Sequence, residues 1–366
     1  MRAGEYLVLT INPGSTTTKI GVYAGEKAEL VRNLSHSDEE MEQFKGKRVL
    51  DQLEFRLAAV EHELAKDKYD LKQFDAIVGR GGLMRGLPSG TYRVNEEMLS
   101  DLRLTRFGDH ASNLGAFMAQ QISRDGGGTA EAFVVDPVSV DEWSDMMRIS
   151  GTALVERHAG GHMLNTKAVA KRYAREQGKP YTSLRLIVAH LGSGVTTSAH
   201  ENGRMIDSQE PGHEGAFSTE RSGGLPLLKT IQLCFSGKYT EKTIWQALNR
   251  EGGLYSYLGT RDLRDVVKMI DAGDKKAALI FDALAYQIAK DICTMAAPLC
   301  GKVDAILLTG GMTYSERLVN KIRPYVEWIA PIVLYPGEDE LQAMAEGALR
   351  VLRGEEQAQE LGPEAK

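Results

Sequence analysis

The first part of the chain alternates short apolar runs with segments of helical periodicity. Residues 6–11 form an apolar, β-branched run of strand length, and residues 20–23 form a second one after a polar turn. Apolar residues then recur at three- and four-residue steps, which predicts an amphipathic helix within residues 38–66. A short strand at 75–78, a helix at 111–122 and a second short strand at 132–135 follow. Alternation of this kind indicates an α/β domain.

A similar pattern of strands and turns begins again after residue 150. A Gly-Ser-Gly turn at 192–194 separates two strand-length runs, and Asn202-Gly203 then predicts a hairpin. The order strand, small polar turn with threonines, strand, turn and strand thus occurs twice, at 10–17 and at 189–197. Gly/Ser turns followed by threonine are common, so coincidence is the alternative. We interpret the repeat as a duplication that places two hairpin tips opposite each other across a cleft.

The rest of the chain adds mostly helices to this plan. They are predicted at 165–176, 225–235, 241–248, 275–297 and 339–352, with strands at 303–309 and 331–335. The polar tail from Arg353 is expected to fray. Helix 275–297 contains Asp282, Lys290 and Asp291, so it is expected in a protein core and not across a membrane.

Length and composition narrow the class of protein. A chain of 366 residues is long for one core, so two domains are expected. With 42% hydrophobic and 26% charged residues, the composition is that of a soluble globular protein. A net charge of −6 argues against nucleic acid or an anionic membrane as the main partner.

The cysteines and the N-terminal sequence indicate a cytoplasmic protein. Cys234, Cys293 and Cys300 are too few and too scattered for a disulfide framework or a zinc site. The chain enters a strand directly, without the apolar region and small-residue cleavage site of a signal peptide.

The turn between the first two strands is the first candidate for chemistry. Pro13-Gly14 predicts a tight hairpin whose tip presents an amide, hydroxyl groups and Lys19. Backbone N–H groups beside hydroxyls and an ammonium can hold phosphate, although an ordinary polar hairpin tip has the same composition. Neither the P-loop pattern nor a dinucleotide-binding glycine pattern between a strand and a helix occurs.

Several segments together resemble the acetokinase family, and within it the butyrate kinases. This family is part of the acetate and sugar kinase, heat-shock chaperone and actin superfamily. The resemblance extends from about Tyr6 to Leu352, and six segments carry it: 11–16 (INPGST), 78–82 (VGRGG), 135–138 (VDPV), 190–194 (HLGSG), 220–223 (ERSG) and 308–312 (LTGGM).

The resemblance implies an α/β fold with duplicated ribonuclease H-like, actin-like ATPase cores around a nucleotide cleft. An N-terminal domain would span 1–150 and be completed by a C-terminal helix at 339–353. A nucleotide-binding domain would span 151–338. The likeness also implies a homodimer or a higher homo-oligomer.

The implied reaction converts ATP and a short-chain carboxylate, butyrate or a branched analogue, into ADP and an acyl phosphate, with Mg²⁺. An acceptor carboxylate is ionised at pH 7, so the reaction needs no general base. Asp136 is then expected to hold Mg²⁺ through water, together with Asn12. Its alternative is an ordinary Asp-Pro turn.

The resemblance also assigns catalytic residues. Arg80 and Arg221 lie beside glycines, and a planar guanidinium suits a carboxylate or a phosphoryl oxygen, although an arginine at a turn is usually only solvated. His158 corresponds to a histidine that meets the phosphoryl group in the transition state. The correspondence is weaker for His162, because glycines replace the polar residues before it.

The implied ligand-binding residues fall into two sets. Phosphate-binding residues are Asn12, Ser15, Thr17, Lys19, His190, Gly192, Ser193 and Gly194. Adenosine-binding residues are Gly310, Gly311 and Met312. For His190, a structural hydrogen-bonding role is the alternative to phosphate contact, and for the glycines it is a simple strand-to-helix turn.

Departures from the acetate kinase pattern favour a larger acid. Gly192-Ser193-Gly194 replaces Gly-Asn-Gly, and the segment 310–315 lacks a glutamate that acetate kinases associate with Mg²⁺. Gly81 and Gly82 replace bulkier residues after Arg80, which would leave room for a longer acyl chain. The alternatives are an acetate or propionate kinase, more distantly a sugar kinase, or a non-enzymatic actin-like nucleotide switch.

Overall fold

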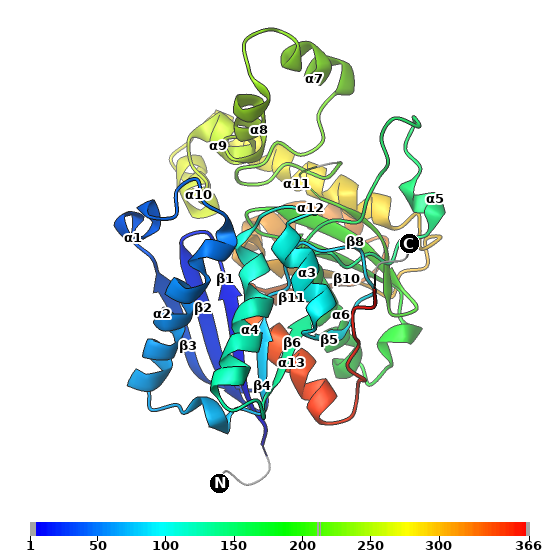
Figure 1. The fold of residues 1–366 in the computed structure, drawn as a ribbon. Helices are drawn as coiled ribbons and strands as arrows, with labels where there is room; N and C mark the ends of the chain where they lie inside the picture. The colour runs from blue at the N-terminus through cyan, green and yellow to red at the C-terminus, as the bar shows by residue number, and fades with distance from the viewer. Residues whose placement is uncertain (1–4, 211, 213, 364–366) are drawn as a thin grey trace. The chain divides into compact units, whose positions relative to one another are not determined.

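The computed structural model describes residues 5–210, 212 and 214–363 (Figure 1). The described chain divides into two compact units. Unit 1 comprises the residues up to Asp141 and those from Asp339 onward, and unit 2 is Glu142–Glu338. Each unit is built on one mixed β-sheet covered by helices.

Unit 1 contains a six-stranded sheet in the order β3-β2-β1-β4-β6-β5. The first three strands form an antiparallel meander, and β4 and β6 continue the sheet parallel to β1. Strand β1 is almost entirely buried, as expected for a near-continuous apolar run in the middle of a sheet. The strands are β1 (Leu7–Pro13), β2 (Thr17–Ala24), β3 (Lys27–Ser35), β4 (Ala76–Gly79), β5 (Thr91–Arg93) and β6 (Glu131–Val135).

Helices cover both faces of this sheet. Val134 packs in a cluster with Phe117 of α4, whereas its neighbour Val135 faces Gly347 of α13. Because successive side chains of a strand point to opposite faces, α4 and α13 lie on opposite sides of the sheet. The helices are α1 (Asp38–Glu42), α2 (Leu53–Lys66), α3 (Glu96–Leu104), α4 (Leu114–Asp125) and α13 (Glu340–Leu352), with short 3-10 helices η1 (Val49–Gln52), η2 (Leu71–Gln73) and η3 (Ala111–Asn113).

Unit 2 contains a five-stranded sheet in the order β11-β10-β7-β8-β9. Strands β7, β8 and β9 form the meander, and β10 and β11 run parallel to β7. The strands are β7 (Leu186–Leu191), β8 (Val195–Glu201), β9 (Arg204–Gln209), β10 (Ala305–Gly310) and β11 (Ile332–Pro336).

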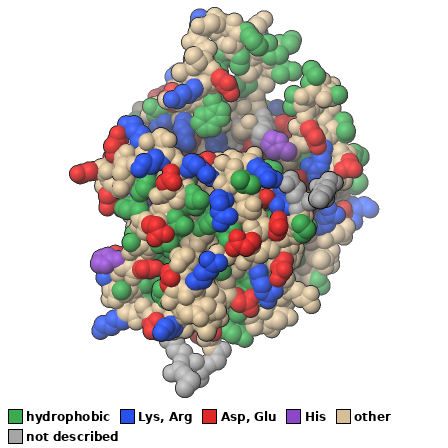
Figure 2. All heavy atoms as spheres, in the orientation of Figure 1, with side chains coloured by type: hydrophobic (Ala, Val, Ile, Leu, Met, Phe, Trp, Pro, Cys, Tyr) green, Lys and Arg blue, Asp and Glu red, His purple; other side chains and the backbone are tan. Residues whose placement is uncertain are grey.

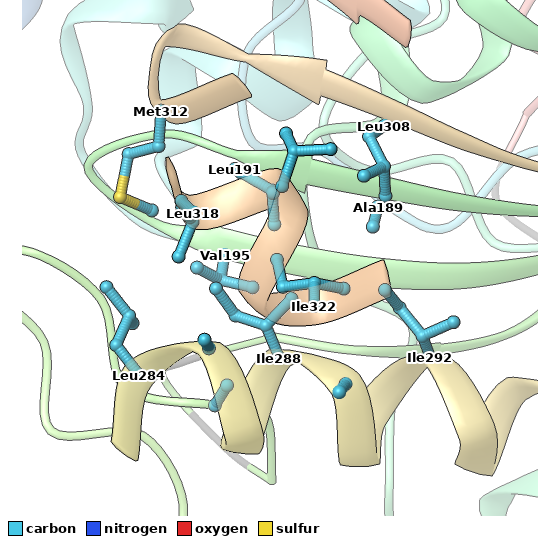
Figure 3. Close-up of a cluster of buried hydrophobic side chains, with 14 of the residues drawn as sticks. Ala189, Leu191, Val195, Leu284, Ile288, Ile292, Leu308, Met312, Leu318 and Ile322 are labelled. Atoms are coloured by element: carbon cyan, nitrogen blue, oxygen red, sulfur yellow. The ribbon is translucent and has the colours of Figure 1, made fainter. Parts of the chain in front are cut away.

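The main core of unit 2 lies between its sheet and α11 (Lys275–Met295). Leu191 and Leu308 of the sheet face Ile288 of this helix, and Ile322 of α12 fills the space beside them (Figure 3). On the other face, α6 packs against β7 and β10. In the described part of the chain, no helix has both the length and the apolar character needed to cross a membrane. The remaining helices are α5 (Asp145–Arg148), α6 (Met163–Glu176), α7 (Leu227–Cys234), α8 (Glu241–Asn249), α9 (Gly253–Leu258), α10 (Leu263–Asp271) and α12 (Glu316–Val326), with η4 (Tyr181–Ser183) and η5 (Gly311–Tyr314).

The two sheets share one strand plan. In each, a three-stranded meander is extended by two strands parallel to its first strand, and unit 1 adds β5 at the edge. The α/β class and the duplicated core are thereby confirmed. The expected cleft between the domains stays a prediction.

Three sequence expectations need correction or adjustment. The unit boundary follows Asp141 and not residue 150, because Glu142 is buried in unit 2 with Lys167 and the N–H of Met205. The helix predicted within 38–66 is broken between α1 and η1, and η1 runs directly into α2. The prediction that the tail frays from Arg353 is wrong for the described residues.

The C-terminal tail pairs with the edge strand β5. The N–H of Gln359 donates to Thr91 O over 2.8 Å, and the N–H of Arg93 donates to Gln359 O over 2.9 Å. Leu361 is buried in a cluster with Met98 and Leu102 of α3. Backbone pairing and one apolar anchor thus order a segment whose composition is polar.

Candidate active site

Three predicted residues lie at the carboxyl ends of adjacent parallel strands in unit 1. The register aligns Ile11 with Gly79, and Gly79 with Val134. Asn12 and Arg80 therefore lie side by side, with Asp136 two residues after Val134 on the next strand. Neighbouring strands are about 4.8 Å apart, so all three residues lie at one edge of the sheet.

The hairpin between β1 and β2 forms the first predicted phosphate loop. Gly14 N donates to Thr17 O over 2.8 Å, which closes the turn, and Ser15 and Thr16 at its tip are exposed. Lys19 pairs with Asn12 across the two strands, and residues paired in this way share one face of a sheet. The exposed Lys19 side chain therefore lies on the same face as Asn12.

Arg80 is a buried guanidinium with an open donor. Its side chain is 7% exposed, and Nη2 lies 3.6 Å from Oε1 of Glu340. Among the described residues, none forms a hydrogen bond with the buried Nη1 atom. Since buried donors are nearly always paired in native proteins, an open one at a sheet edge suits an anionic ligand.

Asp136 adopts an unusual backbone conformation. It is buried and has φ +36°, a left-handed value that is rare for residues other than glycine. Its Oδ1 accepts the N–H of Gly90 over 2.8 Å, and its own N–H donates to Gly90 O over 3.0 Å. Strain of this kind is concentrated at functional sites, which favours a functional role over an ordinary turn.

Glu340 is a site residue that the sequence reasoning missed. It lies in the first turn of α13, and its Oε2 accepts from Nδ2 of Asn12 over 2.6 Å. Nothing local marks this glutamate, because acidic residues are common in the first turn of any helix. The only available signal was the acidic start of a helix expected to return to the first domain.

The oxygen atoms of this edge fit Mg²⁺. Asn12, Asp136 and Glu340 offer the hard oxygen ligands that this ion prefers. In the described part of the chain, no group of three or more His, Cys, Asp or Glu side chains could hold a metal ion. Mg²⁺ usually keeps several waters and binds one or two carboxylates plus phosphate oxygens, so a small protein ligand set suits it.

The second predicted phosphate loop joins β7 and β8 in unit 2. Gly192 N donates to Gly194 O over 2.9 Å, and a Cβ on Gly194 would lie 3.0 Å from Arg221 Nη1. Ser218 ties the loop to the arginine turn, since its Oγ donates to Ser193 O over 2.5 Å and accepts the N–H of Arg221 over 3.2 Å. The structure thus brings Arg221 against the predicted phosphate loop.

Two stacked histidines lie next to this loop. The rings of His162 and His190 are 3.9 Å apart and inclined by 11°. His190 is buried, with Nδ1 2.8 Å from Asn165 Oδ1 and Nε2 3.0 Å from a carboxylate oxygen of Glu338. The contact with Glu338 lies off the direction of a hydrogen bond. His190 therefore has structural contacts as well as a position beside the loop.

His158 precedes α6 in unit 2. It is exposed, in a segment without regular structure that precedes α6. His162, at the N-terminus of α6, is the histidine that contacts the loop, with Nδ1 2.9 Å from Thr196 Oγ1 and Cε1 beside Gly194. The structure thus brings His162 to the predicted phosphate loop, whereas the role of His158 stays a prediction.

A cavity of about 820 Å³ opens beside the second phosphate loop. Gly192, Ser193, Gly311 and Met312 line it, as expected for a nucleotide that extends from phosphate to adenosine. Gly310 has φ +89°, and a Cβ there would lie 2.4 Å from Leu191 O. A glycine at this position therefore allows β10 and β7 to approach each other closely. The sequence reasoning missed the segment that leads into α10 and the first residues of that helix, which add Arg261, Asp262, Leu263 and Arg264 to the lining.

Charge at the cavity wall is fixed by a local ion pair. Hydrogen bonds from the Arg264 side chain and backbone lower the pKa of Asp262 to about 2. Asp262 also caps α10 by accepting the N–H of Arg264. Both side chains are therefore charged at neutral pH and held at the wall of this cavity.

The space expected beside Gly81 and Gly82 is filled by the protein itself. A Cβ on Gly81 would lie 2.3 Å from Pro137 Cβ, and a Cβ on Gly82 would lie 2.4 Å from Asn113 Oδ1. The expectation that these glycines leave room for a longer acyl chain is therefore wrong. They allow Arg80 and its turn to pack against neighbouring segments.

Comparisons with known proteins agree with this geometry. Residues 150–323 match the Acetokinase family. The chain is 48% identical to butyrate kinase 1 of Clostridium acetobutylicum, over 97% of this chain and 99% of that protein. It is 47% identical to butyrate kinase 2 of the same organism, with the same coverage.

Solved structures show the same fold at lower identity. Acetate kinase from Porphyromonas gingivalis aligns with a TM-score of 0.77 at 18% identity, over 95% of this chain and 100% of that chain. A propionate kinase from Francisella tularensis aligns with a TM-score of 0.70 at 18% identity, over 93% and 98%. The chain belongs to the butyrate kinases of the acetokinase family.

Proposed function

We propose that the chain transfers the γ-phosphoryl group of ATP to a short-chain carboxylate, with butyrate or a branched analogue preferred. A carboxylate oxygen forms a bond to the γ-phosphorus while the bond from that phosphorus to the β–γ bridging oxygen breaks in line, which gives the acyl phosphate and ADP. The reverse reaction makes ATP. Because the acceptor is already ionised, no side chain has to remove a proton.

The open donor of Arg80 is the observation that carries the proposal. Its buried Nη1 has no hydrogen-bond partner among the described residues, and the first phosphate loop lies beside it on the same sheet edge. A guanidinium matches the two oxygens of a carboxylate or the equatorial oxygens of a transferring phosphoryl group. A nucleotide switch would not need this additional arginine.

Unit 2 supplies the nucleotide contacts. The glycine loop at 192–194 would hold phosphate oxygens through its backbone, and the cavity lined by Gly311 and Met312 would hold the nucleoside. Arg221 would stabilise the negative charge of the transferring group, which is the main contribution a protein makes to phosphoryl transfer. We also retain His158 as a residue that meets the phosphoryl group, since its exposed side chain is accessible to a ligand.

Mg²⁺ fits the edge of unit 1. Asp136 and Glu340, with the amide oxygen of Asn12, would hold it directly or through water. When bound, the ion neutralises phosphate charge. Asp136 is therefore proposed as a metal-binding residue and not as a base.

Hydroxylamine trapping tests the function directly. The enzyme is incubated with ATP, Mg²⁺ and linear or branched carboxylates of two to six carbons, and acyl phosphate is captured as hydroxamate. We expect butyrate or isobutyrate to give the highest kcat/KM. The absence of hydroxamate with every acid would refute the carboxylate kinase, and equal kcat/KM for acetate and butyrate would refute the preference.

Arg221→Ala tests the catalytic assignment. Loss of one charge contact that strengthens in the transition state lowers kcat by about 10²- to 10³-fold. Arg317→Ala is the matched control, because Arg317 is an exposed arginine of the same unit that pairs with Asp271. A folded Arg221→Ala enzyme with the kcat of the control would remove Arg221 from the site.

The assembly and location of the enzyme are also proposals. Helix α7 exposes Leu227, Leu228 and Ile231, and Phe235 follows it; the space-filling view shows apolar side chains on this segment (Figure 2). Such a surface supports a homodimer or a higher homo-oligomer. We place the reaction in the cytoplasm, where ATP is available, and light scattering of the purified enzyme would measure the oligomeric state.

A further inference from the structure

Arg56 of α2 is a fully buried arginine whose hydrogen bonds are all made to neutral groups. Nη1 donates to Thr17 O over 2.7 Å and to Thr18 Oγ1 over 2.9 Å, and Nη2 donates to Ser15 O over 2.9 Å. Nε and Nη2 also donate to Oε1 of Gln52, over 3.0 and 2.9 Å. These contacts use every N–H bond of the guanidinium.

The charge of Arg56 lacks a carboxylate partner among the described residues. Burial lowers the pKa of Arg56 only to about 10, so the group is charged at neutral pH. Removing an ion from water costs several kcal/mol unless another charge compensates it. A neutral side chain could donate to the same carbonyl groups at a lower desolvation cost. The positive charge at this position therefore points to an anion that comes from outside the protein.

The peptide groups of the first phosphate loop are oriented by this arginine. Arg56 holds the carbonyl oxygens of Ser15 and Thr17. The backbone N–H groups of Ser15 and Thr16 donate to no described residue, and both residues are exposed. The C=O of Ser15 and the N–H of Thr16 belong to one peptide group, so its negative end is bound inside the unit while its N–H remains available to an anion, as in other backbone anion sites.

We propose that Arg56 is a positioning residue for the phosphoryl group bound at this loop, whether the group is carried by ATP or by the acyl phosphate. Arg56 fixes the loop with its N–H groups open, and the bound phosphoryl group supplies the missing negative charge. The inference rests on the proposed function, since the ligand is the group that is transferred.

Steady-state kinetics in both directions test the proposal. In Arg56→Met we expect KM for ATP and for butyryl phosphate to rise by about ten- to a hundredfold, the effect of one or two charge-assisted contacts. KM for butyrate should stay within about twofold, because the carboxylate carries no phosphoryl group. Arg56→Lys keeps the charge but not the fork of donors. Its KM values for ATP and butyryl phosphate should lie between those of Arg56→Met and the wild type.

The controls separate positioning from a purely structural role. Lys66→Met removes an exposed cation from the same helix and should leave every KM unchanged. A structural role alone would lower stability and the active fraction without shifting KM for the phosphoryl ligands. The proposal is overturned by folded variants with wild-type KM values, by an Arg56→Lys enzyme that matches the wild type, or by the failure of both variants to fold.

A binding measurement distinguishes this inference from the proposed reaction. Titration calorimetry with inorganic phosphate needs no turnover, and we expect about tenfold weaker binding to Arg56→Met than to the wild type. If the wild type forms no acyl phosphate but phosphate binding still depends on Arg56, the reaction is wrong and the loop assignment stands. Equal phosphate binding by folded variants would overturn the role of Arg56 itself.

Discussion

Asp291 makes the stability of unit 2 depend on pH. It is a buried carboxyl group of α11, and its Oδ2 accepts the N–H of Ala216, in the segment that leads to Arg221. Burial raises its pKa from 3.8 to about 7, although the hydrogen bond from Ala216 acts in the opposite direction. We predict that Asp291→Asn stabilises the protein at neutral pH relative to the wild type.

The sign and size of the effect follow from proton binding. Between about pH 4 and about pH 7, the unfolded chain has lost this proton while the folded protein still holds it, so rising pH favours unfolding. The pKa difference of about 3 units corresponds to an upper limit of about 4 kcal/mol. The asparagine of the variant has no such proton, and its amide oxygen can still accept from Ala216.

Urea denaturation across this pH range measures the difference. Unfolding is followed by tryptophan fluorescence for the wild type, Asp291→Asn and Asp282→Asn, which removes an exposed carboxylate from the same helix. The difference in free energy of unfolding between Asp291→Asn and the wild type should increase steadily up to about pH 7 and then stay constant. Curves that remain parallel throughout would refute the reasoning.

Other predictions concern the two units separately. Glu340→Gln should raise the Mg²⁺ concentration for half-maximal rate by about tenfold, because a carboxylate ligand is lost; an unchanged Mg²⁺ titration would exclude the residue. Removal of residues 355–366 should lower kcat, because Gln359 holds the backbone on both sides of Gly90, which holds Asp136; a truncated enzyme with full kcat would contradict this link. Glu142→Gln should destabilise unit 2 by about 3–5 kcal/mol in urea, since it leaves buried Lys167 without its carboxylate partner. Full stability of that variant would be the contrary result.

Local sequence determined the fold class and much of the site. Apolar runs of strand length, separated by glycine turns, were sufficient to predict the duplicated sheets, because alternation and turn chemistry act over a few residues. In the structure, Arg80, Asp136 and the two predicted phosphate loops lie at strand ends and turns, and their roles in ligand binding stay predictions. The expectation that Gly81 and Gly82 leave room for a longer acyl chain was wrong. A glycine in the sequence does not show whether neighbouring groups fill the space beside it.

Tertiary structure alone decided the contacts that complete each site. Glu340 reaches Asn12 from 328 positions along the chain, and Arg56 reaches Ser15 from 41. The tail binds β5 because an edge strand offers unpaired backbone groups, which its polar composition does not reveal. Periodicity reports which side of an element is buried, whereas the partner of a buried charge depends on how distant elements pack. Arg56 illustrates the difference: its sequence position predicts a helix, and only the fold shows that it holds the phosphate loop.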